Sequence, residues 1–429
     1  MMQFSFWSRR SLVFWIVTCA WAVAKAQTEQ QSYAIIVDAG SSGSRVRLFR
    51  WTSQRSGSHL PQFEEFFSEK KEPGISTFRN DKLSGIKPYL AELIEAAKRQ
   101  IPEDKHQLSP IYLLATAGMR LLMEPKANTI MDQIRKLLSH NDYCPFYFNQ
   151  LQARILSGEE EGVFAWIAAN YLNRYFDNPV VGKSAGILEL GGASTQIAFI
   201  PDGSILADKF PVRLAGRVYP LYVHSYLYYG QNFADLWVKE YLHRKNRELT
   251  ELTNPCMLRG DRSVVTISNL KLTFHGSGDP VKCKTLVDQL VFKVEPYHCY
   301  PKPCAIGQVY QPTISKTKTF FALSAFTYPL KTLGVLDDTG VFTPAEAYEA
   351  AINYCQKDIQ TIINETGREP DFLSVECLME WPLGAIIYET ERQSLIWCAR
   401  SEMVTSASYK VLTPTGSFVI SISIILIIL

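Results

Sequence analysis

The chain has 429 residues, 47% of them hydrophobic, and a formal net charge of +2 at pH 7. A chain of this length exceeds the usual size of a single hydrophobic core, so we expect two domains. Because the sequence has neither a basic stripe nor an acidic tail, its charge excludes a nucleic acid as the expected partner, and local motifs must indicate the function.

Residues 1–26 are predicted to be a secretory signal peptide. Arg9 and Arg10 precede an apolar run over residues 11–24, which ends in Ala24-Lys25-Ala26. A basic start, a short apolar middle and a small-residue cleavage site are typical of such signals. The alternative is an uncleaved anchor helix, but the run is short for a membrane span of about 20 residues. We therefore expect cleavage after Ala26 and a protein of the secretory pathway.

The next segment, residues 33–51, is predicted to form two strands joined by a tight loop. An apolar β-branched run is followed by a Gly/Ser turn and then by alternating apolar and polar residues. Further along, Ser157 is a good helix N-cap, with Glu160 three residues later. The other expected elements of this half are a helix over 84–99, a strand over 111–114, and helices over 128–138 and 163–171.

Residues 185–200 repeat the plan of residues 33–51. Each segment has an apolar strand, an acidic residue near its end (Asp38 and Glu189), a turn of Gly with Ser or Thr, and a second strand. Because these features recur in register, we interpret the two segments as a duplicated unit. The duplication predicts two similar α/β lobes.

The C-terminal half contains a cysteine-rich region and a predicted helix. Residues 256–304 are expected to form strands and loops. A helix is expected over 344–361, with Thr343 as its N-cap before a proline. Asn364, Glu365 and Thr366 form an N-glycosylation sequon.

Of the nine cysteines, Cys19 is removed with the signal peptide, and the other eight allow up to four disulfides in an oxidising compartment. Cys299 and Cys304 bracket a tight turn, which favours a local bridge between them.

Residues 406–429 form a hydrophobic tail that has two interpretations. Residues 417–429 are almost wholly apolar, and the small residues 406–408 precede a polar spacer. This is the layout of a GPI-anchor signal. A plain hydrophobic tail or a truncated membrane span explains the same pattern, so both interpretations stay open. In either case we expect membrane association.

The two Gly/Ser turns are candidate phosphate-binding loops. Glycine lets the backbone approach a ligand closely, and successive N–H groups in a turn form an anion site. Arg45 adds a positive charge to the first turn, and residues 191–195 form the matching second turn. Two ordinary hairpin turns are the alternative, but the pair favours a clamp on a polyphosphate. Hydroxyl donors in the first turn come from Ser41, Ser42 and Ser44.

Asp38 and Glu189 lie where the strands meet these turns. A carboxylate repels phosphate unless a cation lies between them, and Mg²⁺ and Ca²⁺ take oxygen ligands. We therefore predict a metal–phosphate complex held through water. The alternative for each residue alone is a solvated acid at a strand end.

Residues 159–161 are three glutamates at the start of a predicted helix. Negative charge there complements the helix dipole, which explains the cluster without any chemistry. A catalytic role requires one of them to face the phosphate loops and deprotonate a water molecule. The sequence alone does not choose among the three. Because no Ser, His or Cys triad is evident, a direct attack by water is favoured over a covalent intermediate.

Four motifs carry a resemblance to a known family: residues 37–45 (VDAGSSGSR), 114–122 (LATAGMRLL), 157–163 (SGEEEGV) and 188–196 (LELGGASTQ). In this order they resemble the ecto-nucleoside triphosphate diphosphohydrolases, or apyrases, of the actin-like, sugar-kinase-like superfamily. Weaker matches at 72–76, 221–230 and 320–328 extend the resemblance over most of the chain from Tyr33 to about Cys377.

The resemblance implies an α/β fold of two ribonuclease-H-like lobes, with the active site in the cleft between them. It implies a lobe I over residues 27–156, completed by 381–405, and a lobe II over 157–380. The implied activity is hydrolysis of the terminal phosphate of nucleoside tri- or diphosphates, at the extracellular surface or in the Golgi lumen.

Roles for individual residues also follow from the resemblance. Glu161 is implied as the general base, and Ser194 and Gln196 as residues that position the attacking water. Asp38 and Glu189 are implied to hold Ca²⁺ or Mg²⁺ through water. Tyr328 lies near the position of the aromatic residue on which the nucleobase stacks. The implied phosphate contacts are Ser41, Ser42, Gly43, Ser44, Arg45, Thr116, Ala117, Gly191, Gly192 and Ala193.

Three features depart from the family's pattern. Glu189 stands where the family usually has Asp, which moves the carboxylate outward by one methylene. Few residues separate Cys377 from Trp381, so part of the base-binding wall is in question. Gly43 stands where cell-surface members often have His, so the preferred base stays open.

For the cysteines, we favour Cys299–Cys304 and Cys355–Cys377. By that count Cys256 pairs with Cys283. Cys144 and Cys398 then have no assigned partner.

Besides the nucleotide phosphohydrolase, two other functions compete. A polyphosphatase or a kinase of the same superfamily is the second hypothesis, and a kinase is disfavoured because the cell exterior holds little ATP. The third is a nucleotide-binding surface protein with weak or lost catalysis. Glu189 and the short C-terminal region support it, whereas the intact Glu161, Ser194 and Gln196 oppose it.

Overall fold

The computed structural model describes residues 31–366 except 53–59, 79–83, 180–182, 292–299, 316, 327–329, 331–332 and 336–340. The chain divides into two compact units, Met1–Ile387 and Tyr388–Leu429, and every described residue belongs to the first. The predicted signal peptide, the segment 381–405 and the hydrophobic tail lie outside the described residues.

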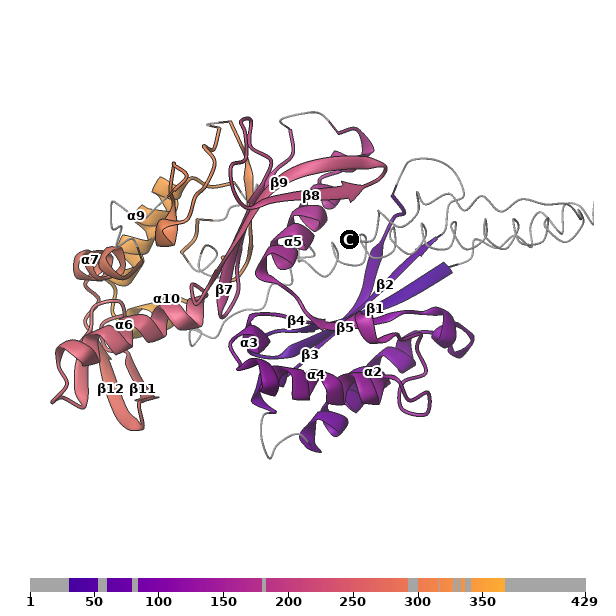
Figure 1. The fold of residues 1–429 in the computed structure, drawn as a ribbon. Helices are drawn as coiled ribbons and strands as arrows, with labels where there is room; N and C mark the ends of the chain where they lie inside the picture. Colours follow the sequence, from indigo (N-terminus) through magenta and orange to yellow (C-terminus); the bar gives the residue numbers. More distant parts are fainter. Residues whose placement is uncertain are drawn as a thin grey trace, which may run out of the picture. The chain divides into compact units, whose positions relative to one another are not determined.

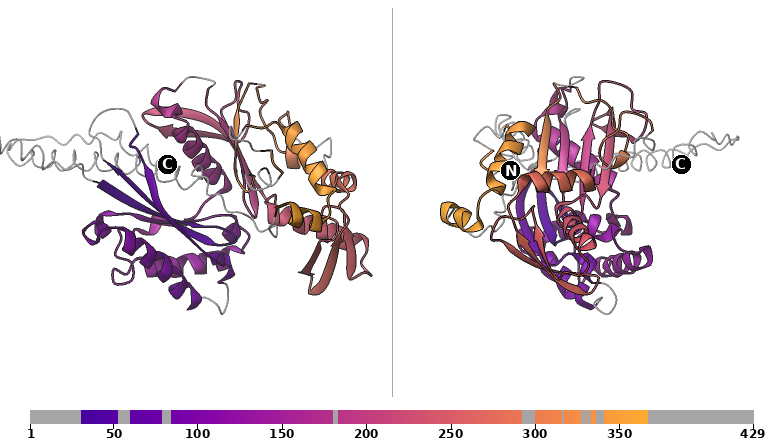
Figure 2. Two further views of the ribbon diagram at one scale, coloured as in Figure 1. Left: turned by 180° about the vertical axis from the view of Figure 1, so that it is seen from behind. Right: turned by 90° about the vertical axis from the view of Figure 1, so that its left-hand side faces the viewer.

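The first sheet contains five strands in the order β3-β2-β1-β4-β5. Strands β1 and β2 form an antiparallel hairpin in which Asp38 pairs with Arg45, and β4 runs parallel to β1. Helices α2 and α4 pack on this sheet and on each other (Figure 1, Figure 2). The bounds are β1 Gln31–Ala39, β2 Ser44–Thr52, β3 Glu64–Lys71, β4 Ile111–Ala115, β5 Ala153–Ile155, α2 Ile86–Gln100 and α4 Glu124–Leu138.

The second sheet, in the order β13-β6-β7-β9-β8, repeats this plan. Strands β6 and β7 form the matching antiparallel hairpin, and β13 runs parallel to β6 as β4 does to β1. Strand β9 adds to β7 as β3 adds to β2. The predicted duplication within an α/β fold is therefore confirmed. The bounds are β6 Gly186–Leu190, β7 Ser194–Phe199, β8 Lys209–Leu214, β9 Arg217–Leu227 and β13 Phe320–Ser324.

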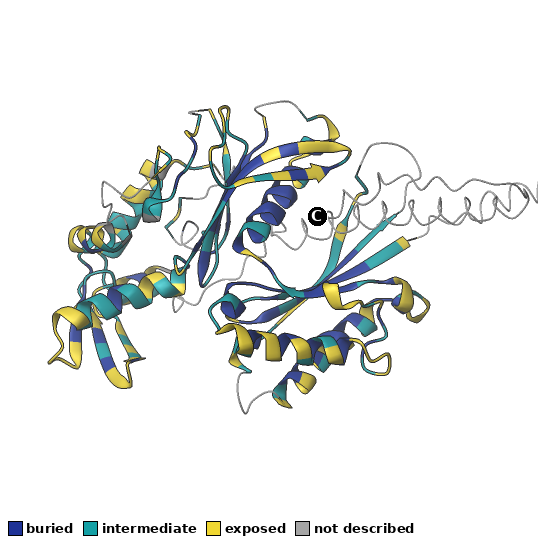
Figure 3. Cartoon of the chain, in the orientation of Figure 1, coloured by how far each residue is buried: buried dark blue, intermediate teal, exposed yellow. Residues whose placement is uncertain are grey.

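Helix α5 (Gly158–Leu172) packs on β6, β7 and β9. Its residues from Val163 to Asn170 are all buried, as expected for a helix that is apolar on every side (Figure 3). Trp166 is fully buried against the rings of Phe176 and Tyr219. The start of α5 is consequently held in one place relative to the second sheet.

The cysteine-rich region contains a helix that the sequence did not predict. Strands β10 (Glu251–Asn254), β12 (Leu270–Gly276) and β11 (Arg262–Ile267) form a small sheet beside α6 (Gln231–Lys245). Residues Pro280–Val291 form helix α7, which packs on α6. The expectation of strands and loops alone was wrong here, because Cys283, Val287 and Leu290 recur at helical spacing and face residues of α6.

The predicted helix over 344–361 is interrupted. Helix α9 (Pro344–Cys355) begins at the predicted N-cap, where the Thr343 side chain accepts a hydrogen bond from the Glu346 N–H. After a short break, α10 spans Ile359–Thr366. Within the described ranges, no helix has both the length and the apolar character needed to cross a membrane.

The cysteines confirm one predicted bridge and contradict another. Cys256 and Cys283 form a disulfide, as expected. Cys304 is also disulfide-bonded, while its expected partner Cys299 lies outside the described residues. Cys355 has a free thiol, so the predicted bridge to Cys377 was wrong; cysteine spacing alone does not determine pairing.

Replacing both cysteines of the Cys256–Cys283 bridge by serine should lower the free energy of unfolding by about 3–4 kcal/mol, because the bridge closes a loop in the unfolded chain. The bridged residues are 27 apart in the sequence. Denaturant unfolding measures the change, with Cys355→Ser as the control that removes a thiol but no bridge. Equal stability of the two variants would contradict a stabilising role for this disulfide.

Candidate functional site

Both hairpin turns line a single pocket of about 140 Å³. The first sheet contributes its β1–β2 turn and the start of α3 (Ala117–Arg120), and the second contributes its β6–β7 turn. The start of α5 and the end of β13 complete the wall. The lining residues are Asp38, Gly40, Ser41, Ser42, Thr116, Ala117, Glu161, Glu189, Gly191, Gly192, Ala193, Ser194 and Ser324. Most of the residues predicted to form the site are thus brought together.

The turns owe their positions to glycines that allow close backbone contact. A Cβ atom on Gly118 would lie 2.7 Å from the Ser41 Cα, and one on Gly74 would lie 2.5 Å from the Ser41 carbonyl oxygen. In the second turn, the carbonyl oxygens of Gly191 and Gly192 accept hydrogen bonds from the first N–H groups of α6. These acceptors are therefore satisfied by the protein, which favours an anion over a cation at the turn.

The three glutamates at the start of α5 have different surroundings. Glu160 forms a capping box with Ser157 and an ion pair with Arg154 at 2.6 Å, which confirms the predicted N-cap. Glu161 instead lines the pocket and is only 6% exposed. The structure therefore separates helix capping from the pocket, a choice that the sequence left open.

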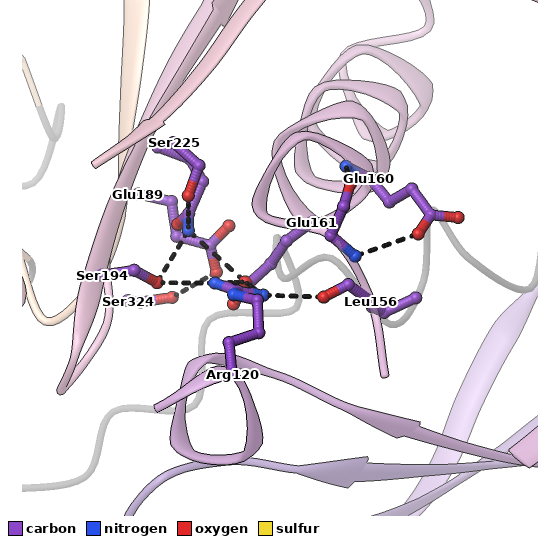
Figure 4. A network of polar contacts seen from close by, with 10 residues as sticks. Arg120, Leu156, Glu160, Glu161, Glu189, Ser194, Ser225 and Ser324 are labelled. Atoms are coloured by element: carbon purple, nitrogen blue, oxygen red, sulfur yellow. Dashed lines mark hydrogen bonds and ion pairs between the residues drawn. The ribbon is translucent and has the colours of Figure 1, made fainter. Parts of the chain in front are cut away.

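Arg120 connects the Glu161 carboxylate to the second sheet (Figure 4). Its two terminal nitrogens, Nη1 and Nη2, both donate to Glu161 Oε2 at 3.0 Å. Nη2 also donates to Ser194 Oγ at 3.2 Å, and Nη1 donates to the carbonyl oxygen of Leu156 at 3.0 Å. A single guanidinium therefore organises both Glu161 and Ser194.

Gln196 does not line the pocket but holds two residues that do. Its Nε2 donates to Ser194 Oγ at 2.8 Å and approaches Glu161 Oε2 at 3.4 Å. The same nitrogen donates to Ser225 Oγ at 3.0 Å. Because Gln196 is fully buried, it acts on the pocket through Ser194 and Glu161.

Burial raises the pKa of the Glu161 carboxyl above its ordinary value, because a charged carboxylate loses hydration there. The positive charge and hydrogen bonds of Arg120 oppose this effect, and the nearby Glu159 adds to it. The group is therefore a carboxylate whose proton affinity exceeds that of an exposed glutamate.

Three predicted phosphate contacts lie outside the pocket wall. A Cβ atom on Gly43 would lie 2.7 Å from the Lys71 carbonyl oxygen, so this residue packs against β3. Ser44 is buried, with its N–H donating to Tyr89 Oη at 3.1 Å. Arg45 lies in β2 opposite Asp38. The predicted base-stacking residue, Tyr328, lies outside the described residues.

Arg120, Ser324 and Ser225 are site residues that the sequence analysis did not assign. Arg120 and Ser324 stand inside recognised motifs, which was the available signal, but their roles depend on contacts with distant elements. Ser324 Oγ donates to Glu189 Oε1 at 3.2 Å. It thereby holds the Glu189 carboxylate in place.

Asp38 and Glu189 fit a hydrated divalent cation better than a fully enclosed one. Both line the same pocket as several hydroxyl groups. Within the described part of the chain, no group of three His, Cys, Asp or Glu residues is arranged to hold a metal ion. Mg²⁺ is typically bound by one or two carboxylates, with water and phosphate oxygens completing its shell. The donor set therefore fits Mg²⁺, or Ca²⁺ in the same manner, shared with a phosphate.

Residues 24–380 match the model of the GDA1/CD39 (nucleoside phosphatase) family. The chain belongs to this family. It is 32% identical over 359 residues to human ectonucleoside triphosphate diphosphohydrolase 3, covering 76% of this chain and 65% of that protein. It is 31% identical over 316 residues to the guanosine-diphosphatase of Schizosaccharomyces pombe, covering 67% of this chain and 55% of that protein.

A solved structure shares the fold of this GDA1/CD39 family member. The nucleoside triphosphate hydrolase of Neospora caninum superposes with a TM-score of 0.62 at 17% sequence identity, covering 89% of each chain. The chain spans 65% of the length of its human relative named above.

Gly230→Ala should displace the second turn of the pocket. Gly230 has φ −74° and ψ 162°, which alanine adopts without strain, but the new Cβ would lie 2.3 Å from the Ala193 backbone nitrogen. We expect a loss of about 1–3 kcal/mol in the free energy of unfolding from this overpacking. Gly203→Ala is the control, because a Cβ there meets nothing within 4 Å. A Gly230→Ala variant as stable as the control would contradict this packing.

Proposed function

We propose that the protein hydrolyses the terminal phosphate of nucleoside tri- or diphosphates by direct attack of water, with Glu161 as the general base. The observation that carries this proposal is the buried Glu161 carboxylate, which shares one pocket with two Gly/Ser turns. Membership of the nucleoside phosphatase family and the names of the relatives support the substrate class.

The phosphates would be held by the two turns. Ser41, Ser42 and Thr116 offer hydroxyl groups at the pocket wall, and Gly192 and Ala193 offer backbone N–H groups, while the Gly191 N–H closes the turn on the Ser194 carbonyl oxygen. Charge-assisted hydrogen bonds of this kind stabilise phosphate oxygens and fix the terminal phosphorus in place. Asp38 and Glu189 would hold Ca²⁺ or Mg²⁺ through water. When bound, that ion neutralises charge on the phosphate oxygens.

In the chemical step, Glu161 takes a proton from a water molecule while the water oxygen forms a bond to the terminal phosphorus. The bond from phosphorus to the bridging oxygen breaks, and that oxygen keeps the electron pair. The products are inorganic phosphate and the nucleotide shortened by one phosphate, and the proton leaves Glu161 with phosphate or solvent. Ser194, which lines the pocket, would position the water directly, and Gln196 would do so through its hydrogen bonds to Ser194 and Glu161.

We further propose a place in the secretory pathway, at the extracellular surface or in the Golgi lumen, with membrane association. This rests on the signal-like residues 1–26, the apolar tail 406–429 and the predicted disulfide chemistry. We also propose that lobe I spans residues 27–156 and is completed by 381–405, and that lobe II spans 157–380. The nucleobase would stack on Tyr328. Gly43, Ser44 and Arg45 were also predicted to contact phosphate. Their positions outside the pocket wall do not support that prediction.

The first prediction concerns Glu161→Gln. Removal of the base should lower kcat by about 10²- to 10⁴-fold while nucleotide binding is kept. Phosphate release from ATP, ADP, UDP and GDP, with Ca²⁺ or Mg²⁺, measures the loss. Glu160→Gln is the matched control on the same helical turn, because Glu160 caps α5 and lies outside the pocket wall.

The same assay with EDTA tests the metal requirement, and release should stop. If the folded wild-type protein binds nucleotides but releases phosphate from none of them, the hydrolase proposal fails and the nucleotide-binding surface protein replaces it.

A second prediction concerns pH. Because burial raises the Glu161 pKa, the carboxyl stays protonated to a higher pH than an ordinary glutamate. Activity should therefore fall, as pH decreases, through a limb that lies above about pH 4.3, the usual glutamate value. The profile of kcat/KM for ATP and for GDP measures it. A limb at or below that value, or one that differs between the two substrates, would assign the titration to another group.

A further inference from the structure

Arg120 is a partly buried cation that does not line the pocket. Its side chain is 15% exposed, and it is not among the residues that line the pocket. All of its described hydrogen bonds go to protein groups on other elements: Glu161 Oε2, Ser194 Oγ and the Leu156 carbonyl oxygen. Its effect on a substrate must therefore act through Glu161 and Ser194.

We infer that Arg120 is a positioning residue that makes Oε1 of Glu161 the atom that takes the proton from water. Both terminal nitrogens of Arg120 donate to Oε2, and Gln196 Nε2 approaches the same oxygen (Figure 4). Oε1 has no hydrogen bond to any described residue, although Glu161 lines the pocket. This inference rests on the proposed role of Glu161 as the general base.

The same contacts determine how Ser194 meets a ligand. A hydroxyl group has one hydrogen to donate and two lone pairs that accept. Ser194 Oγ accepts from Arg120 Nη2 at 3.2 Å and from Gln196 Nε2 at 2.8 Å, which occupies both lone pairs. Its hydrogen is therefore free to be donated to an oxygen in the pocket that Ser194 lines. Arg120 thus orients an acceptor, Glu161 Oε1, beside a donor, Ser194.

Arg120 also determines the charge balance around the base. Asp38 on β1 and Glu189 on β6 line the pocket together with Glu161, and the negative charge of Glu159 on the same helix raises the pKa of Glu161. No lysine or arginine is among the described residues that line the pocket. Burial raises the pKa of Glu161, and Arg120 opposes that rise. Without Arg120, the base should stay protonated to a still higher pH.

The Arg120→Gln variant tests whether Arg120 controls the Glu161 carboxyl, because the substitution removes the positive charge and keeps a polar side chain. The acid limb of kcat/KM should move upward by about one to three pH units, since a neighbouring positive charge lowers a carboxyl pKa by that amount. KM should change little, because Arg120 does not line the pocket. Arg154→Gln is the matched control: it breaks the neighbouring Arg154–Glu160 pair and should leave the limb where it is in the wild type. A folded Arg120→Gln variant with an unmoved limb overturns the inference.

Arg120→Lys keeps the charge but replaces two donor nitrogens by one. Its limb should stay at the wild-type position, while kcat per folded molecule falls by about 10- to 100-fold because the base is misoriented. A wild-type kcat in this variant overturns the inference. If circular dichroism shows that Arg120→Gln does not fold, the kcat of Arg120→Lys tests the inference in its place.

Infrared titration provides a readout that does not need turnover. The carboxyl C=O band that is missing in Glu161→Gln should titrate at higher pH in Arg120→Gln than in the wild type, and an equal titration overturns the inference. If Glu161→Gln keeps full activity, the proposed function fails, and the infrared comparison still shows whether Arg120 controls this carboxyl.

Discussion

A carboxylate is held out of water at the start of α5, and the groups around it are arranged to keep it there. Glu161 is 6% exposed and is bound by Arg120, with Gln196 beside it. An isolated buried charge is strongly destabilising, so the guanidinium and the amide must stay in place for the carboxylate to remain. Both partners come from other parts of the chain: Arg120 ends the short helix that follows β4, and Gln196 lies in the second sheet. The fold and the site consequently depend on the same contacts.

The duplicated hairpins explain why two stretches far apart in the sequence deliver acids to the same pocket. Asp38 and Glu189 occupy corresponding positions in β1 and β6, each beside a turn and each next to an added parallel strand. The two copies are not identical, since Glu189 is one methylene longer and is bound by Ser324 from that added strand. The hydrogen bond from Ser324 limits how far the longer side chain reaches. The longer of the two acidic side chains is thus accompanied by a local contact that restrains it.

Sequence patterns predicted the strand–turn–strand units, the capped start of α5 and most of the pocket wall, because these depend on local order along the chain. They did not predict which of the residues after a turn would face the pocket. Gly43, Ser44 and Arg45 were all expected at the phosphate, but Gly43 packs against the Lys71 carbonyl, and Ser44 and Arg45 already belong to β2, outside the pocket wall. Arg120 was overlooked because its role is visible only when α3, α5 and β7 are together. Helix α7 was missed because a cysteine-rich composition suggested loops.

The parallel pairing of β13 with β6 has a consequence for how the protein is made. The first sheet is complete once the ribosome has passed Ile155, because all five of its strands precede that residue. The second sheet must wait much longer, since the partner of Gly186 is Phe320. During that interval one edge of β6, the strand that carries Glu189, has no neighbour to satisfy its backbone groups. The nascent chain therefore passes through a stage in which its N-terminal half can be folded while half of its active site still needs protection from aggregation.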